Sequence, residues 1–112
     1  MKGMIIVAHG SRVEEANRQV MQKIDALEAN LIKQFECVQA AFLEYASPSL
    51  HQVLDEQVQK GIHEIVVFPY FLSSGRHVAQ DIPDVLAVYQ KQHAHLVFRL
   101  LPCLGELPSL TD

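Results

Sequence analysis

The stretch from Ile5 to Arg12 reads IIVAHGSR, and it combines an apolar run with an abrupt polar ending. Its isoleucine, valine and alanine side chains favour a β-strand that is buried on both faces. The run stops at His9, and a glycine, a hydroxyl group and a guanidinium group follow directly. The stretch therefore predicts a buried strand that presents polar groups at its carboxyl end.

Three further apolar runs are similar to the first, and longer amphipathic stretches separate them. Because the runs are nearly continuous rather than alternating, they predict strands of a parallel sheet covered on both faces. The predicted strands are Met4–Ala8, Val38–Leu43, Ile65–Phe71 and Leu96–Leu101. This order predicts an α/β fold with three α/β/α layers and right-handed crossovers. We expect the flavodoxin-like strand order 2-1-3-4, which makes the first and third strands neighbours.

Capping residues predict where the first two helices begin. The first helix is expected over Val13–Lys33, with Ser11 and Glu14 at the spacing of a capping box. The second is expected to begin at Ser47 as its N-cap, with Pro48 in its first turn. Both stretches carry apolar residues at helical spacing, so each predicts one helix packed on the sheet.

A glycine and a proline predict the end of the second helix and the start of the third. Gly61 is a natural C-terminal stop. The third helix is expected to begin around Asp81–Pro83, because Pro83 should prevent a smooth extension back through His77. We see no linker or repeat, so residues 1–112 are expected to form a single domain.

Composition narrows the classes of function. The chain has 112 residues, of which 49% are hydrophobic and 20% are charged, a composition typical of globular proteins. Its formal net charge of −4 argues against a nucleic-acid partner. No apolar run approaches the roughly 18 residues of a membrane span, and the first is too short for a signal peptide. We therefore expect a cytoplasmic protein without a membrane partner. Cys37 and Cys103 are expected to be reduced and buried.

Titratable side chains follow three of the predicted strands. His9 follows the first, Glu44 the second and His77 the third. Because ligands of such sheets bind at the carboxyl ends of the strands, two imidazoles from neighbouring strands could reach one divalent ion there. Glu44 could complete a partial coordination sphere, which would leave positions open for an exchangeable metal.

Each of these residues also has an ordinary structural interpretation. A strand-end histidine often hydrogen-bonds its own loop, and Ser11 could be only a helix cap. Arg12 and Arg76 could be solvated surface charges, and Glu44 could cap a neighbouring loop. The convergence of two histidines and a glutamate on one predicted edge favours the metal-site interpretation.

Three blocks of the sequence resemble the small cobalt chelatases of the CbiX/SirB family. The blocks are VAHGSR (7–12), FLEYASPSL (42–50) and VVFPYFLSSGRHVAQDIP (66–83). These proteins are class II chelatases, which insert a divalent metal into sirohydrochlorin or a related tetrapyrrole. The resemblance implies a flavodoxin-like domain with its site at the strand ends, and pairing of short members as homodimers.

The resemblance also implies roles for individual residues. His9 and His77 fall on the metal-site histidines, and Glu44 falls on the acidic position that completes the catalytic set. Contacts with the macrocycle or its carboxylates are expected from Ser11, Ser73, Ser74, Gly75 and Arg76 in the matching blocks. Arg12 is added because it and Arg76 are the two cations at this edge, and the substrate is a polycarboxylate. The substrate metal is expected to be Co²⁺, with Fe²⁺ and Ni²⁺ as alternatives, since imidazole and carboxylate accept all three. No nucleotide-binding motif is present, so insertion is expected to be independent of ATP.

The sequence departs from the family after Gly105, and two other functions are alternatives to metal insertion. Family members continue past the position of Gly105 into a last helix, whereas this sequence ends with ELPSLTD, so we expect that helix to be missing or truncated. A non-catalytic carrier of metal or tetrapyrrole is the main alternative function. A histidine phosphatase is disfavoured, because Ala8 stands where that chemistry generally wants an arginine.

Overall fold

The structure is a computed structural model that describes residues 1–70 and 76–101, with only the backbone described for residues 76–80. Strands and helices alternate along these residues. They are β1 (Lys2–Ala8), α1 (Glu14–Leu31), β2 (Cys37–Phe42), α2 (Leu50–Gln59), β3 (Glu64–Pro69), α3 (Arg76–Gln92) and β4 (Val97–Leu100). The four predicted strands are thus all present, but β4 is largely exposed rather than buried on both faces as predicted.

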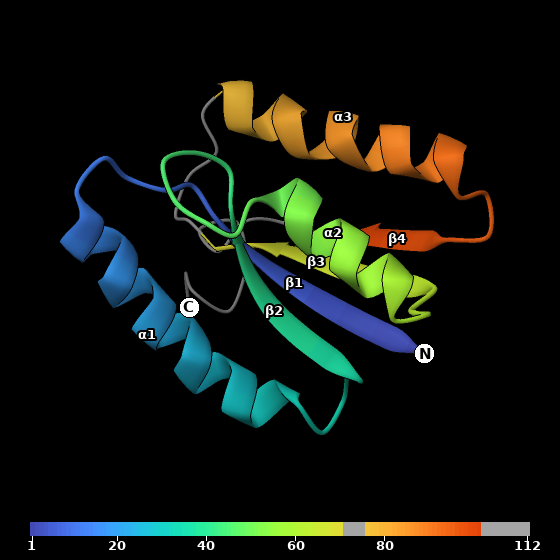
Figure 1. Ribbon diagram of the computed structural model, residues 1–112, viewed down its shortest axis with the longest axis horizontal. Helices are drawn as coiled ribbons and strands as arrows, with labels where there is room; N and C mark the ends of the chain where they lie inside the picture. Colours follow the sequence, from blue (N-terminus) through green and yellow to red (C-terminus); the bar gives the residue numbers. More distant parts are fainter. Residues whose placement is uncertain (71–75, 102–112) are drawn as a thin grey trace, which may run out of the picture.

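The strands form one parallel sheet in the order β2-β1-β3-β4, which confirms the predicted fold class and strand order. β1 lies at the centre, where Ala8 pairs with Phe42 of β2 and Val7 pairs with Pro69 of β3. The carboxyl ends of these three strands therefore lie at one shared edge of the sheet (Figure 1).

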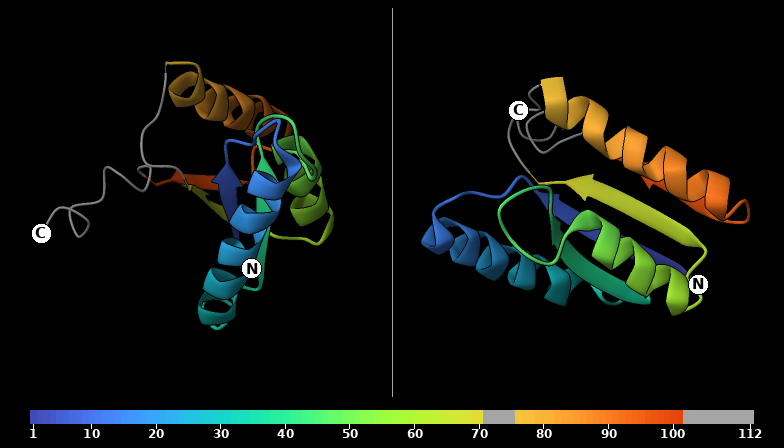
Figure 2. Two further views of the ribbon diagram at one scale, coloured as in Figure 1. Left: turned by 90° about the vertical axis from the view of Figure 1, so that its left-hand side faces the viewer. Right: turned by 45° about the horizontal axis from the view of Figure 1, so that its top comes forward.

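Helices cover both faces of the sheet, with α1 on one face and α2 and α3 on the other (Figure 2). Successive residues of β1 enter opposite layers. Ile5 and Val7 pack with residues of α2 and α3, whereas Met4 and Ile6 pack with Ile24 of α1. Burial of both faces is what an unbroken apolar run requires, since side chains alternate between the two sides of a strand.

The start of α2 differs from the prediction. Its N-cap is Ser49, whose hydroxyl accepts a bond from the Gln52 amide while the Gln52 side chain accepts one from the Ser49 amide, at 3.2 and 2.8 Å. The predicted cap at Ser47 is wrong because the chain still pairs with β2 at this point. The amide of Phe42 donates to the carbonyl of Pro48 at 2.8 Å, so the helix begins only afterwards.

The end of α2 confirms the predicted stop at Gly61. This glycine has a φ of +86°, and its amide donates to the carbonyl of Val58 at 3.0 Å. The next amide, that of Ile62, donates to Gln57 at 3.1 Å. These two bonds form a Schellman motif, which satisfies carbonyl groups of the last helical turn.

The predicted capping box at the start of α1 is wrong. The helix begins at Glu14, and its N-cap is Val13, which makes no side-chain capping bond. The hydroxyl of Ser11 instead accepts a bond from the Val13 amide at 3.0 Å, before the helix starts. Val13 is 61% exposed, so it does not belong to the buried stripe that the sequence predicts.

The predicted start of α3 is also wrong, because the helix begins at Arg76 and contains Pro83. A proline inside a helix removes one backbone hydrogen bond and crowds the preceding turn. The helix continues past it with Ile82, Leu86 and Tyr89 buried against the sheet. Packing of this face thus outweighs the lost bond, and His77 lies in the first turn of a helix rather than in a loop.

Other predictions have mixed outcomes. Cys37 is half-buried rather than buried, and its thiol lies 3.3 Å from a side-chain oxygen of Gln39. Cys103 and the expected absence of a last helix concern residues 102–112, which lie outside the described residues. Within the described ranges, no helix is long and apolar enough to span a bilayer.

The capping of α2 provides a test of the fold. Ser49→Ala removes the hydroxyl that accepts the Gln52 amide, so the free energy of unfolding should fall by about 1 kcal/mol. Ser47→Ala, the matched control at the cap expected from sequence, should change it by less than about 0.5 kcal/mol. Urea denaturation followed by circular dichroism measures both, and the reverse order of effects would contradict this start of α2.

Candidate functional site

The segments that follow β1 and β2 continue side by side beyond the strands. The amide of Leu43 donates to the carbonyl of Ala8, and that of Glu44 donates to the carbonyl of His9, both at 3.0 Å. Gly10 then turns with a φ of +96°, and a Cβ atom there would lie 1.8 Å from the Glu44 carbonyl oxygen. Position 10 therefore requires glycine, and the close approach fixes His9 beside Glu44.

His9 and Glu44 form the centre of the candidate site. The His9 Nε2 atom lies 3.8 Å from a carboxylate oxygen of Glu44, and the two side chains are 48% and 51% exposed. Nitrogen and oxygen ligands bind zinc-sized ions at about 2.0–2.2 Å, so two donors of one ion can be up to about 4 Å apart. The pair is therefore spaced to share a divalent ion while solvent and a further ligand reach it.

The third predicted ligand lies at the same edge of the sheet. His77 is in the first turn of α3, which begins near the segments that follow β1 and β2 (Figure 1). Its side chain, like that of Arg76, is outside the described residues, as are Ser73, Ser74 and Gly75 altogether. Within the described part of the chain, no cluster of three or more histidine, cysteine or acidic side chains could hold a metal.

Asn17 holds the segment after His9 in place, a role that sequence reasoning missed. Its side-chain oxygen accepts a bond from the Ser11 amide at 2.8 Å, and its amide group donates to the Ser11 carbonyl at 2.7 Å. An asparagine one turn into a helix is a poor helix former that favours local backbone contacts, and this was the available signal. The paired bonds fix the backbone of Ser11, whose side chain is half-buried at the site.

Tyr45 is the second residue that sequence reasoning missed. It directly follows Glu44, is 57% exposed, and has a φ of +64°, a conformation that residues with side chains rarely adopt. The guanidinium carbon of Arg12 lies 5.2 Å from the centre of its ring, which is a cation–π contact. An exposed aromatic residue just after a strand end was the signal in the sequence.

A cavity of about 580 Å³ opens between the first turns of α1 and the segment after β2. Its lining includes Ser11, Arg12, Asn17, Met21, Tyr45 and Ser47. Arg18, also in the lining, donates to Glu15 from Nε at 2.9 Å, and this contact holds the pKa of the Glu15 carboxyl below its usual value. The charge of Arg18 is therefore offset by its neighbour on the helix.

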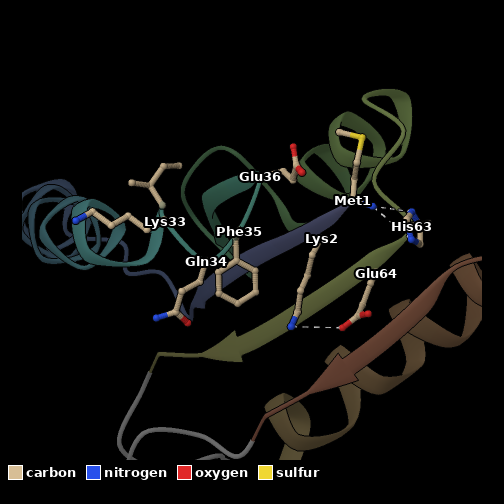
Figure 3. Close-up of a pocket in the computed structure, with 9 residues that line it drawn as sticks. Met1, Lys2, Lys33, Gln34, Phe35, Glu36, His63 and Glu64 are labelled. Atoms are coloured by element: carbon tan, nitrogen blue, oxygen red, sulfur yellow. Dashed lines mark hydrogen bonds and ion pairs between the residues drawn. The ribbon is translucent and has the colours of Figure 1, made fainter.

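A second cavity of about 580 Å³ lies at the opposite edge, beside the amino ends of the strands (Figure 3). Its charged groups contact one another. Lys2 lies 3.7 Å from Glu64, and the terminal amine of Met1 lies 3.1 Å from a ring nitrogen of His63. Ligands of open α/β sheets bind at the carboxyl ends of the strands, so the edge with His9 is the stronger candidate site.

These features define a doubly wound α/β protein with a histidine and a glutamate side chain paired at the carboxyl edge of its sheet. The chain belongs to the CbiX family, whose model matches residues 3–112. This match confirms the resemblance seen in the sequence. The resemblance rests on the sequence at the ends of β1, β2 and β3 and directly after them. The segments that follow β1 and β2 form the paired backbone around Gly10.

Sequence relatives are named for metal chelatases. A sirohydrochlorin cobaltochelatase of Methanopyrus kandleri is 35% identical over 79% of this chain and 60% of its own length. The chloroplastic sirohydrochlorin ferrochelatase of Arabidopsis thaliana is 33% identical over 98% of this chain and 48% of its own length. The chain therefore spans less than two thirds of the length of these relatives.

Solved structures share the fold. A cobalamin (vitamin B12) biosynthesis CbiX protein from Marinobacter aquaeolei VT8 is 26% identical with a TM-score of 0.76, over 99% of this chain and 88% of that one. SirB from Bacillus subtilis with Fe³⁺ is 21% identical with a TM-score of 0.86, over 97% of this chain and 42% of that one. The second likeness concerns the fold alone.

The close approach at Gly10 can be tested with a matched pair of glycines. Gly10→Ala introduces both a strained φ and a collision with the Glu44 carbonyl, so the free energy of unfolding should fall by about 3 kcal/mol. Gly61→Ala has a similar φ but no atom within 4 Å of its Cβ, so we expect a loss of about 1 kcal/mol. Urea unfolding measures both, and equal losses would contradict the tight packing at position 10.

Proposed function

We propose that this protein inserts a divalent metal into sirohydrochlorin or a related tetrapyrrole, without nucleotide, in cobalamin- or sirohaem-type biosynthesis. The observation that carries the proposal is the pairing of His9 with Glu44 at 3.8 Å, at the strand edge where this fold binds ligands. Membership of the CbiX family and the names of its relatives supply the substrate class.

Metal insertion requires a partly desolvated ion, the loss of two pyrrole protons and a macrocycle whose nitrogens face the ion. We assign His9 and His77 to the metal, because imidazoles displace some of its water ligands while binding weakly enough to release it. Glu44 then serves as a third ligand or as the base that accepts a pyrrole proton. Its half-exposed position beside His9 suits either role, since solvent can carry the proton away.

Cobalt is the metal that we expect first, with iron and nickel as alternatives. Relatives named cobaltochelatase and ferrochelatase both match this chain, so similarity does not separate the two. The donor set of imidazole and carboxylate accepts all three ions, and availability decides much of the selectivity in such sites. We expect the reaction to take place in the cytoplasm.

We also propose that two copies of the chain act together as a homodimer. The chain covers 42% of SirB, so a single copy supplies less than half of that fold. A tetrapyrrole is broad and flat. A macrocycle bound at the sheet edge of a single copy would leave one of its two faces exposed to solvent. A second copy facing the first would cover that side and exclude water from the metal.

The residue assignment predicts the loss of activity in two variants. His9→Ala and His77→Ala should each lower the rate of insertion of Co²⁺ into sirohydrochlorin at least about 100-fold, because each removes a group that binds the metal. His63→Ala is the control at the opposite edge and should keep the full rate. Anaerobic absorption spectroscopy with Co²⁺, Fe²⁺ and Ni²⁺ measures insertion, and urea unfolding verifies that each variant is folded.

The same assay distinguishes the rival functions. A carrier would shift the spectrum of sirohydrochlorin without accelerating insertion of any of the three metals, and this result in the unaltered protein would exclude the enzyme. Full activity in both histidine variants would exclude the assigned metal site. Hydrolysis of an aryl phosphate would instead support the histidine phosphatase.

A further inference from the structure

Tyr45 has an unusual backbone conformation, and packing in the core does not explain it, because the side chain is exposed. Its side chain is 57% exposed, and its φ of +64° lies in the left-handed region that favours glycine. Residues held in such conformations cluster at ligand sites, where the surrounding structure keeps a side chain in a required place. The neighbours of Tyr45 therefore indicate what it is held there to contact.

The ring of Tyr45 contacts Arg12, whose guanidinium carbon lies 5.2 Å from the ring centre. No carboxylate of the described residues forms an ion pair with Arg12, in contrast to Arg18, which is bound to Glu15. A guanidinium that contacts a ring and forms no ion pair still has N–H groups with which to bind an anion. Arg12 is thus available to a carboxylate of a ligand, a group that guanidinium commonly binds through two parallel hydrogen bonds.

The cavity beside this pair has both apolar and polar walls. Phe42 is almost fully buried at its base, and Met21 and Ala46 add further apolar surface. Ser11, Asn17 and Ser47 contribute hydroxyl and amide groups. At about 580 Å³, it can receive the edge of a flat ring system together with an acidic side chain.

The cavity also lies next to the candidate metal site along both chain segments. Arg12 is three residues after His9, and Tyr45 directly follows Glu44. The two bonds from Asn17 to the backbone of Ser11 fix the segment that connects His9 to Arg12. A macrocycle centred over the metal ligands would therefore extend one edge toward Arg12.

We propose that Arg12 and this cavity form a subsite for a carboxylate-bearing edge of the tetrapyrrole, with Tyr45 as the residue that positions Arg12. The inference rests on the proposed function and deepens it, because it assigns recognition of the peripheral acid groups to one side of the site. Glu14 is also in the lining, and its negative charge would restrict a ligand carboxylate to the side of the cavity that carries Arg12.

The test replaces Tyr45 without adding backbone strain. Tyr45→Gly and Tyr45→Asn both tolerate a positive φ and lack the ring. Each should raise the KM for sirohydrochlorin about tenfold, weaken binding of the metal-free macrocycle equally, and leave kcat within about twofold. Tyr45→Phe keeps the ring and should match the unaltered protein, as should Lys23→Ala, which removes an exposed cation from α1 outside the cavity.

A double variant tests whether Tyr45 acts through Arg12. Arg12→Ala should raise KM by more than Tyr45→Gly does, and the double variant should be no worse than Arg12→Ala alone. Additive losses, or an unchanged KM in both Tyr45 variants, would overturn the subsite while leaving the proposed function intact. Failure of the unaltered protein to bind sirohydrochlorin would overturn both. Titration followed by absorption spectroscopy measures binding, and initial insertion rates give KM and kcat.

Discussion

The carbonyl oxygen of Glu44 occupies the space in which a side chain at position 10 would lie, and the rest of the site depends on this close approach. Because Gly10 has no Cβ atom, the segments after β1 and β2 continue to pair beyond the sheet, through the bond from Glu44 to the His9 carbonyl. The imidazole and the carboxylate consequently lie 3.8 Å apart. Two residues distant in sequence thereby become one candidate pair of metal ligands.

The close approach of Gly10 and Glu44 also positions the residues that follow them in the two segments. Beyond Gly10, Asn17 holds the backbone of Ser11 and so directs Arg12 toward the ring of Tyr45. The candidate metal ligands and the proposed carboxylate subsite thus share one hydrogen-bonded piece of backbone, so that a shift in one would displace the other. This connection suits the proposed metal insertion, in which the ion and the macrocycle must meet in a fixed orientation.

The fold could be predicted from sequence because β1, β2 and β3 are apolar runs that become buried when helices cover both faces of a sheet. The burial expected for β4 was wrong, because Val97 and Leu100 at this edge of the sheet are exposed. Local rules were less reliable where tertiary structure overrode them. Pro83 lies inside α3 because packing of Leu86 and Tyr89 outweighs one lost bond, and Ser49 caps α2 because Pro48 still pairs with β2. The proximity of His9 and Glu44 could be predicted from their places after neighbouring strands. The contact of Tyr45 with Arg12 depends on a left-handed residue that no spacing reveals.

Anomalous diffraction from crystals soaked with Co²⁺ tests most directly whether the strand edge is a metal site. We expect one cobalt ion bound to a ring nitrogen of His9, with the carboxylate of Glu44 or the imidazole of His77 as a further ligand at about 2.0–2.2 Å. A cobalt ion held at the opposite edge, by His63 and its neighbours and without His9, would contradict the central claim.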